Sequence, residues 1–273
     1  MKTDTPGWIS AHSEDDEDFQ RWAAGPIQLV DFAIHIHYLQ QYIRRGDLVL
    51  EVGAGGGRFT QEIATLTDQI TVVDISPDKI ERNRRNAVAT GYADRVRAWI
   101  QADMCDLKPH LADGRFDVLV CYGGPLSYVF DRREKAISEL VRVTKPGGLL
   151  LLSARSLWGT VHEFLPTILH FDPRINREIV ATGDMGPTQV ALATRFWHAY
   201  RAAEFKEFIE AAGTTVILQS ASDCLSATWR DMLAAWQADE GTWKHLLELE
   251  IMACREPGAL DMGNHVFAVA RKR

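Results

Sequence analysis

The sequence predicts an α/β protein whose centre is a doubly wound sheet. Short apolar strands alternate with helical segments between residues 47 and 153, and a glycine-rich turn over residues 53–57 follows the first strand. The strands are apolar along nearly their whole length, which is typical of a parallel sheet covered by helices on both faces. Right-handed crossovers between such strands give a doubly wound sheet, and its ligands bind beyond the carboxyl ends of the strands.

The individual elements follow from hydrophobic periodicity. Strands are expected over residues 47–52, 69–74, 95–101, 116–121, 149–153, 214–219 and 263–271. Helices are expected over residues 26–43, 59–66, 77–90, 131–143, 201–212 and 228–254, the last one broken near Gly241. Ser76 followed by Pro77 is a helix start signal, and Asp131 with Glu134 three residues later resembles a capping box. Residues 156–194 lack clear periodicity and are expected to form an insertion over the sheet edge.

The composition narrows the function classes. The chain of 273 residues carries 30 basic and 37 acidic side chains, and this acidic balance disfavours binding to a nucleic-acid backbone. No apolar run is long enough to cross a bilayer, and the first ten residues do not resemble a signal peptide. We therefore expect a cytoplasmic protein without membrane contact. The cysteines form no C-x-x-C pair, so neither a metal site nor a disulfide framework is expected; they are Cys105, Cys121, Cys224 and Cys254.

The glycine-rich turn is the main candidate for a ligand site. Glycines there allow the backbone to approach a ligand and to adopt positive φ angles, and the helix that follows presents N–H groups. A dinucleotide site would have glycine or alanine at the sixth position of G-x-G-x-x-G, but Arg58 stands there. The pattern is instead E-x-G-x-G-x-G, made by Glu51, Gly53, Gly55 and Gly57.

This pattern resembles motif I of the class I S-adenosylmethionine (SAM)-dependent methyltransferases, and further landmarks of that family follow in its order. Asp74 ends the second strand, where the family has an acidic residue that bonds both ribose hydroxyls, and Ile75 takes the place of an apolar residue beside adenine. Asp103 and Met104 take the adenine-binding positions after the third strand. The resemblance implies SAM as the cofactor, S-adenosylhomocysteine as the product, and a binding site made by Glu51, Gly53, Ala54, Gly55, Asp74, Ile75, Asp103, Met104 and Cys121.

The same resemblance implies the domain organisation. The whole chain, residues 1–273, is expected to form a single Rossmann-like methyltransferase domain with seven strands, mostly parallel, the last one antiparallel. Residues 1–45 are expected to form an N-terminal helical cover. Residues 156–199, inserted after the fifth strand, and residues 224–260 are expected to form an insertion and a cap on the substrate side.

The reaction needs few catalytic groups, because the methyl group of SAM is already activated. The protein must align the acceptor atom with the methyl carbon and the sulfur and exclude water, and a base is needed only where the acceptor carries a proton. Tyr128 and His198 are candidates for such a base, although ordinary packing also explains each of them.

The expected acceptor is an oxygen or nitrogen atom of a small organic molecule. Aromatic residues are frequent between residues 155 and 243 and suit an apolar pocket. The segment after the fourth strand lacks the D/N-P-P-Y/F motif with which amino-methyltransferases of DNA grip a flipped base, which again disfavours nucleic acid. A SAM-binding protein without methyl transfer and a protein methyltransferase are the alternatives, and a homodimer is a further possibility.

Overall fold

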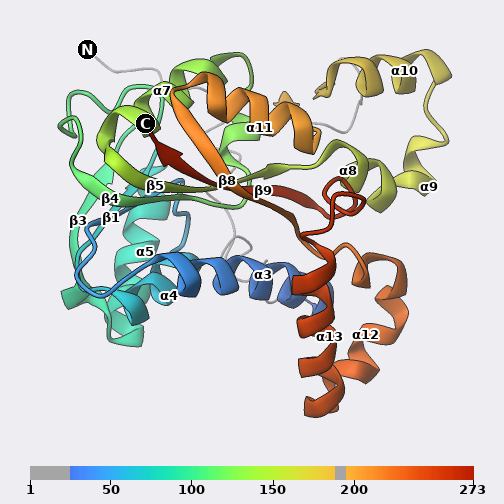
Figure 1. Cartoon of the computed structure of the whole chain (residues 1–273), viewed down its shortest axis with the longest axis horizontal. Helices are drawn as coiled ribbons and strands as arrows, with labels where there is room; N and C mark the ends of the chain where they lie inside the picture. Colours follow the sequence, from blue (N-terminus) through green and yellow to red (C-terminus); the bar gives the residue numbers. More distant parts are fainter. Residues whose placement is uncertain (1–24, 188–194) are drawn as a thin grey trace.

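The computed structural model describes residues 25–187 and 195–273. It contains a seven-stranded sheet, whose arrangement Figure 1 shows. The strand order is β3-β2-β1-β4-β5-β9-β8. Strands β1 to β5 pair in parallel, whereas β9 runs antiparallel to both β5 and β8. The predicted mostly parallel sheet with an antiparallel last strand is therefore confirmed. The strands are β1 (Val49–Val52), β2 (Ile70–Asp74), β3 (Val96–Gln101), β4 (Phe116–Cys121), β5 (Thr144–Arg155), β8 (Thr214–Ala221) and β9 (His265–Lys272).

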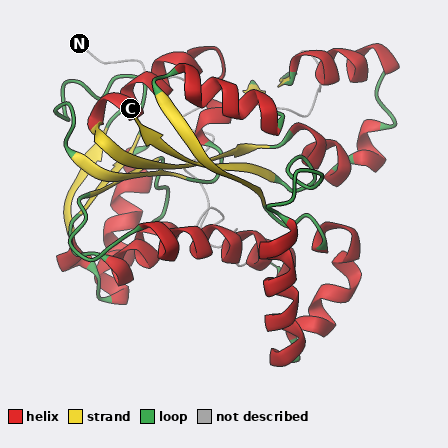
Figure 2. Ribbon diagram, in the orientation of Figure 1, coloured by secondary structure: helices red, strands yellow, loops and turns green. Residues whose placement is uncertain are grey.

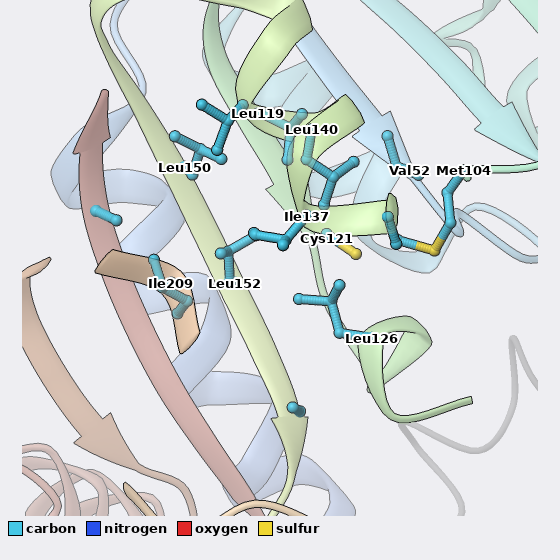
Figure 3. Packing of buried hydrophobic residues seen from close by; sticks show 14 of the residues in the cluster. Val52, Met104, Leu119, Cys121, Leu126, Ile137, Leu140, Leu150, Leu152 and Ile209 are labelled. Carbon is cyan, nitrogen blue, oxygen red and sulfur yellow. The ribbon is translucent and has the colours of Figure 1, made fainter. Parts of the chain in front are cut away.

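Alternating residues of the strands divide between two hydrophobic cores, one on each face of the sheet. Leu119 and Cys121 of β4 belong to one core, and Val118 and Val120 belong to the other. Since both faces are covered, β1 and β2 are buried at every position, as their apolar sequences predict. Figure 3 shows the first core, in which leucines of β4 and β5 meet side chains of a covering helix.

Helices cover both faces of the sheet (Figures 1 and 2). Residues of α3 (Pro26–Tyr42), α4 (Arg58–Leu66) and α5 (Pro77–Thr90) pack in one core, and residues of α7 (Arg133–Val143) and α11 (Ala202–Ala211) pack in the other. Helix α5 has the predicted start: the hydroxyl of Ser76 accepts the N–H of Lys79, and Pro77 takes the first helical position.

The predicted capping box at Asp131 is wrong. The chain turns at Phe130 with a φ of 47°, and a short 3₁₀ turn, η2 (Phe130–Arg132), leads directly into α7. The N-cap of α7 is Arg132, and no side chain caps this helix. A capping box needs an extended residue at the N-cap, and the 3₁₀ turn leaves no such residue before α7.

The insertion after β5 holds short helices that its sequence did not predict. They are α8 (Leu157–Glu163), α9 (Leu165–Ile168) and α10 (Pro173–Thr182), followed by the small hairpin of β6 (Asp184–Met185) and β7 (Trp197–His198). Near the C-terminus, α12 (Arg230–Gln237) and α13 (Glu240–Ala253) stand together at the lower right of Figure 1. Their break lies just before Gly241, because Asp239 caps α13 by accepting the N–H of Thr242. Within the described ranges, no helix has both the length and the apolar character needed to cross a bilayer.

Candidate functional site

A cavity of about 700 Å³ lies at the carboxyl ends of β1, β2, β3 and β4. This is the edge at which a doubly wound sheet binds its ligands. The predicted cofactor residues that line the cavity are Gly53, Ala54, Gly55, Asp74, Ile75, Asp103 and Met104. Residues from three separate loops therefore meet at one site, as the sequence predicts. Glu51 and Cys121 do not line the cavity; both are buried in the strands behind it.

The glycine turn forms one wall of the cavity. Gly53 and Gly55 have φ angles of 71° and 55°, a region that side chains disfavour. A Cβ atom on Gly53 would lie 2.5 Å from Cγ of Pro125, so the turn after β1 packs tightly against α6 (Pro125–Tyr128). A Cβ atom on Gly55 would meet nothing within 4 Å. The main chain at Gly55 thus faces open space within the cavity.

Asp74 connects the ends of β1 and β2. Its Oδ2 accepts the N–H of Gly55 at 2.8 Å, and its Oδ1 accepts the N–H of Ser76 at 2.9 Å. Burial raises the pKa of this carboxyl group, and the backbone N–H bonds partly offset that rise. The two bonds orient the carboxylate within the cavity wall, in the position from which a diol could be held.

Asp103 lines the cavity and also shapes the loop after β3. Its Oδ1 accepts the N–H of Cys105 at 2.8 Å, and its Oδ2 lies 2.8 Å from the guanidinium of Arg132. Asp103 therefore both forms the turn and lines the cavity. Arg132 also lines the cavity, so η2 and the β3 loop close this side of the site together.

A buried polar network supports the glycine turn from behind. The hydroxyl of Thr60 donates to Oε2 of Glu51 at 2.5 Å and accepts from the amide of Asn83 at 2.9 Å. Burial raises the pKa of Glu51 to about 8, because the hydrogen bond from Thr60 only partly offsets desolvation. Asn86 donates to the carbonyl of Gly56 at 2.8 Å. We did not predict Thr60, Asn83 or Asn86, although two asparagines in one helix, α5, are a weak signal for buried amides.

Part of the cavity wall is aromatic and cationic. The guanidinium carbon of Arg195 lies 3.8 Å from the ring centre of Tyr128, and the rings of Phe130 and Phe196 stack at 5.4 Å. All four residues line the cavity, and so does Lys79. Burial lowers the pKa of Lys79 to about 8, with contributions from two nearby arginines. The candidate base Tyr128 therefore lies in the cavity wall, next to Arg195.

The second candidate base, His198, does not reach the cavity. Its ring is buried, with Nδ1 2.6 Å from Asp184 and Nε2 2.7 Å from Glu204. Burial alone would raise the pKa of Glu204, but the hydrogen bond to His198 holds it below its usual value. His198 thus links β6, β7 and α11. Ordinary packing, the alternative explanation for this residue, therefore accounts for its position.

A second buried network lies under the turn that follows β4. The hydroxyl oxygen of Ser153 accepts the N–H of Gly123 at 3.0 Å and lies 3.0 Å from Nε2 of His35. Nδ1 of His35 lies 2.8 Å from the carbonyl of Asp31 and 3.2 Å from its carboxylate. The order of groups resembles a serine–histidine–aspartate relay, but Ser153 is fully buried and does not line the cavity. The network therefore supports Gly123, which does line it.

Comparisons with known proteins find similarity to methyltransferases. Residues 49–148 match the model of a methyltransferase domain family. The chain is 32% identical over 129 residues to the ubiquinone/menaquinone biosynthesis C-methyltransferase of Azotobacter vinelandii, covering 44% of this chain and 49% of that protein. A tRNA 5-carboxymethoxyuridine methyltransferase of Escherichia coli is 25% identical over 232 residues, covering 82% of this chain and 79% of the relative.

Solved structures show the same fold. A SAM-dependent methyltransferase from Mesorhizobium loti superposes with a TM-score of 0.58 at 16% identity, covering 89% of this chain and 100% of that chain. Sequence similarity is more local, since the match spans about half the length of the Azotobacter relative. The matched residues 49–148 contain the glycine turn, Asp74, Asp103 and the turn after β4.

Proposed function

We propose that this chain, a member of the class I SAM-dependent methyltransferases, transfers the methyl group of SAM to an oxygen or nitrogen atom of a small organic acceptor. One observation carries the proposal: the glycine turn and a group of aromatic and cationic side chains line the same cavity. Cofactor and acceptor can therefore meet in one enclosed space, which methyl transfer requires.

The cofactor end of the cavity fits the adenosyl group. In our proposal Asp74 holds the ribose hydroxyls, because its carboxylate is oriented by Gly55 and Ser76 and forms part of the wall. Ile75 packs against adenine, and Asp103 with Met104 meets the edge of that ring. The open main chain at Gly55 leaves room for the cofactor, since a side chain there would occupy the cavity. SAM supplies the activated methyl group.

The aromatic and cationic part of the cavity wall fits a planar organic acceptor. Tyr128, Phe130 and Phe196 supply aromatic surface, and Arg195 adds a positive charge beside Tyr128. These side chains would orient the acceptor and exclude water from the line between acceptor atom, methyl carbon and sulfur. Where the acceptor carries a proton, the hydroxyl of Tyr128 is one group in the wall that could receive or relay it.

The direct test has two stages. Calorimetry with SAM, with NADH as the competing cofactor, tests the binding step, and we expect SAM to bind and NADH not to bind. Release of S-adenosylhomocysteine with a panel of phenols, amines and carboxylic acids then tests the transfer step. SAM binding without release for any acceptor, protein or RNA would contradict methyl transfer. Label transfer from radiolabelled SAM to polypeptide would favour a protein substrate instead.

A nucleoside within tRNA is a second candidate acceptor. The Escherichia coli relative is named for a tRNA substrate, and its match covers most of both chains. Because of this similarity, a nucleic-acid acceptor stays open as an alternative, even though the chain is acidic overall. Methyl incorporation into total tRNA, compared with methyl transfer to the small-molecule panel, distinguishes the two acceptors.

Three other expectations stay predictions: a homodimer, a cytoplasmic location, and a covering role for residues 1–45 and 224–260. For the insertion after β5, the structure shows that Pro187, Arg195 and Phe196 line the cavity.

A further inference from the structure

Three metal-binding side chains meet where the C-terminal helices join the sheet. We call Cys224, Glu250 and Cys254 the thiol–carboxylate cluster. The two Sγ atoms lie 3.3 Å apart, and each lies 3.5 Å from Oε2 of Glu250. Cys224 lies between β8 and η3 (Ser226–Trp229), whereas Glu250 and Cys254 are one turn apart near the end of α13. The cluster thus joins segments separated by 30 residues.

The distances agree with the first coordination shell of zinc. A tetrahedral ion with Zn–S bonds of about 2.3 Å and a Zn–O bond of about 2.0 Å places a sulfur and an oxygen about 3.5 Å apart and two sulfurs about 3.8 Å apart. Both sulfur–oxygen distances in the cluster already have this value, and the sulfurs need to separate by only about 0.5 Å. A disulfide would require the sulfurs to approach to about 2.05 Å, which is a larger movement.

The burial of Glu250 is a second and independent observation. Its side chain is fully buried, and its oxygens accept the backbone N–H groups of Leu225 and Ser226, the latter at 2.5 Å. Among residues 25–187 and 195–273, no lysine, arginine or histidine forms an ion pair with it. A buried carboxylate without a cationic partner is costly, and a metal ion is one of the groups that compensate it.

We propose that the thiol–carboxylate cluster binds one zinc ion. Thiolate and carboxylate ligands suit zinc, and Cys224 is only partly buried, so water can supply the fourth ligand from its side. Binding releases the two thiol protons to solvent. The ion ties the segment after β8 to the end of α13, and therefore holds the hairpin of α12 and α13 in place. This role is structural and independent of methyl transfer.

The test uses the full chain without an affinity tag, reduced and stripped of metal. Zinc sulfate alone is titrated against a chromophoric chelator, the bound ion is counted by mass spectrometry, and cobalt is used as a spectroscopic substitute. The variants are Cys224→Ser, Cys254→Ser and Glu250→Gln, and the matched control is Cys105→Ser, a buried cysteine outside the cluster. Glutamine at position 250 can still accept the two backbone N–H groups.

We expect one zinc ion per chain, release of about two protons on binding, and a thiolate-to-cobalt charge-transfer band. Either serine variant should weaken zinc binding by at least about 100-fold, and Cys105→Ser should not. If Cys254→Ser does not fold, the more exposed Cys224→Ser and the cobalt band of the native chain still decide the question. Zinc binding that is unchanged in Cys224→Ser, or a reduced native chain that takes up no zinc, would overturn the proposal.

Discussion

Replacement of Glu51 by glutamine should change how the stability of the protein depends on pH. Glu51 is buried behind the glycine turn, and its pKa of about 8 means that it is mostly protonated in the folded protein at neutral pH. Glutamine has nearly the same shape, stays neutral, and can still accept the hydrogen bond from Thr60. The variant should therefore keep the turn intact while removing the titration.

The sign and the size of the effect follow from linkage. Because the folded pKa lies above the ordinary value of 4.5, the contribution of Glu51 to stability is fully present below pH 4.5 and is lost as the pH rises through about 8. At about 1.4 kcal/mol per pH unit, the total loss is on the order of 5 kcal/mol. The glutamine variant lacks this loss, so its stability relative to the native protein should rise by that order between these two pH values.

The assay is urea unfolding of both proteins at about pH 5, 7 and 9. Glu62→Gln is the matched control, because it removes a partly exposed carboxylate from the same helix, α4, that carries Thr60. The Glu62 variant should follow the native protein at each pH. If the difference in unfolding free energy between Glu51→Gln and the native protein is the same at about pH 5 and 9, then Glu51 is not a neutral group in the folded state and the reasoning is refuted.

Three further predictions concern the cavity. Asp74→Ala should weaken SAM binding by about 1–3 kcal/mol, or about 10- to 100-fold in calorimetry, with an unchanged affinity counting against the ribose assignment. Gly53→Ala should lower both the melting temperature and the affinity for SAM, because its Cβ would lie 2.5 Å from Pro125. Gly147→Ala is the control: it has a similar positive φ and no neighbour within 4 Å, so its melting temperature should fall less. Tyr128→Phe should keep the affinity for SAM; a reduced kcat would support proton relay by its hydroxyl, and an unchanged kcat would exclude it.

The sheet could be predicted because its strands are short apolar runs with clear ends. Residues 49–52 and 70–74 are apolar almost throughout, and burial on both faces follows from that. The insertion after β5 could not be predicted in the same way. Its helices are short, and α9 buries none of its side chains while α10 buries only Ile179, so no broad apolar face marks these two helices in the sequence. The predicted start of α7 was wrong because no local sequence signal marks the turn at Phe130, where φ is positive.

The candidate site could be predicted where a residue follows directly after a strand. Gly53, Asp74 and Asp103 come after β1, at the end of β2 and after β3, and the parallel sheet brings those ends together. Glu51 and Cys121 lie one step further back, inside the strands, so the sheet buries them. Asn83 is a polar residue in the middle of a charged helix, and only the packing of α5 on the glycine turn shows that it is buried. Likewise, the pairing of Cys224 with Cys254 has no short-range signal.

The central claim is that the cavity beside the glycine turn holds the adenosyl group of SAM, and a crystal structure with S-adenosylhomocysteine tests it most directly. We expect the nucleoside in this cavity, with its ribose hydroxyls on the carboxylate of Asp74 and its adenine beside Ile75 and Met104. A nucleoside bound elsewhere, or ribose hydroxyls without contact to Asp74, would contradict the account.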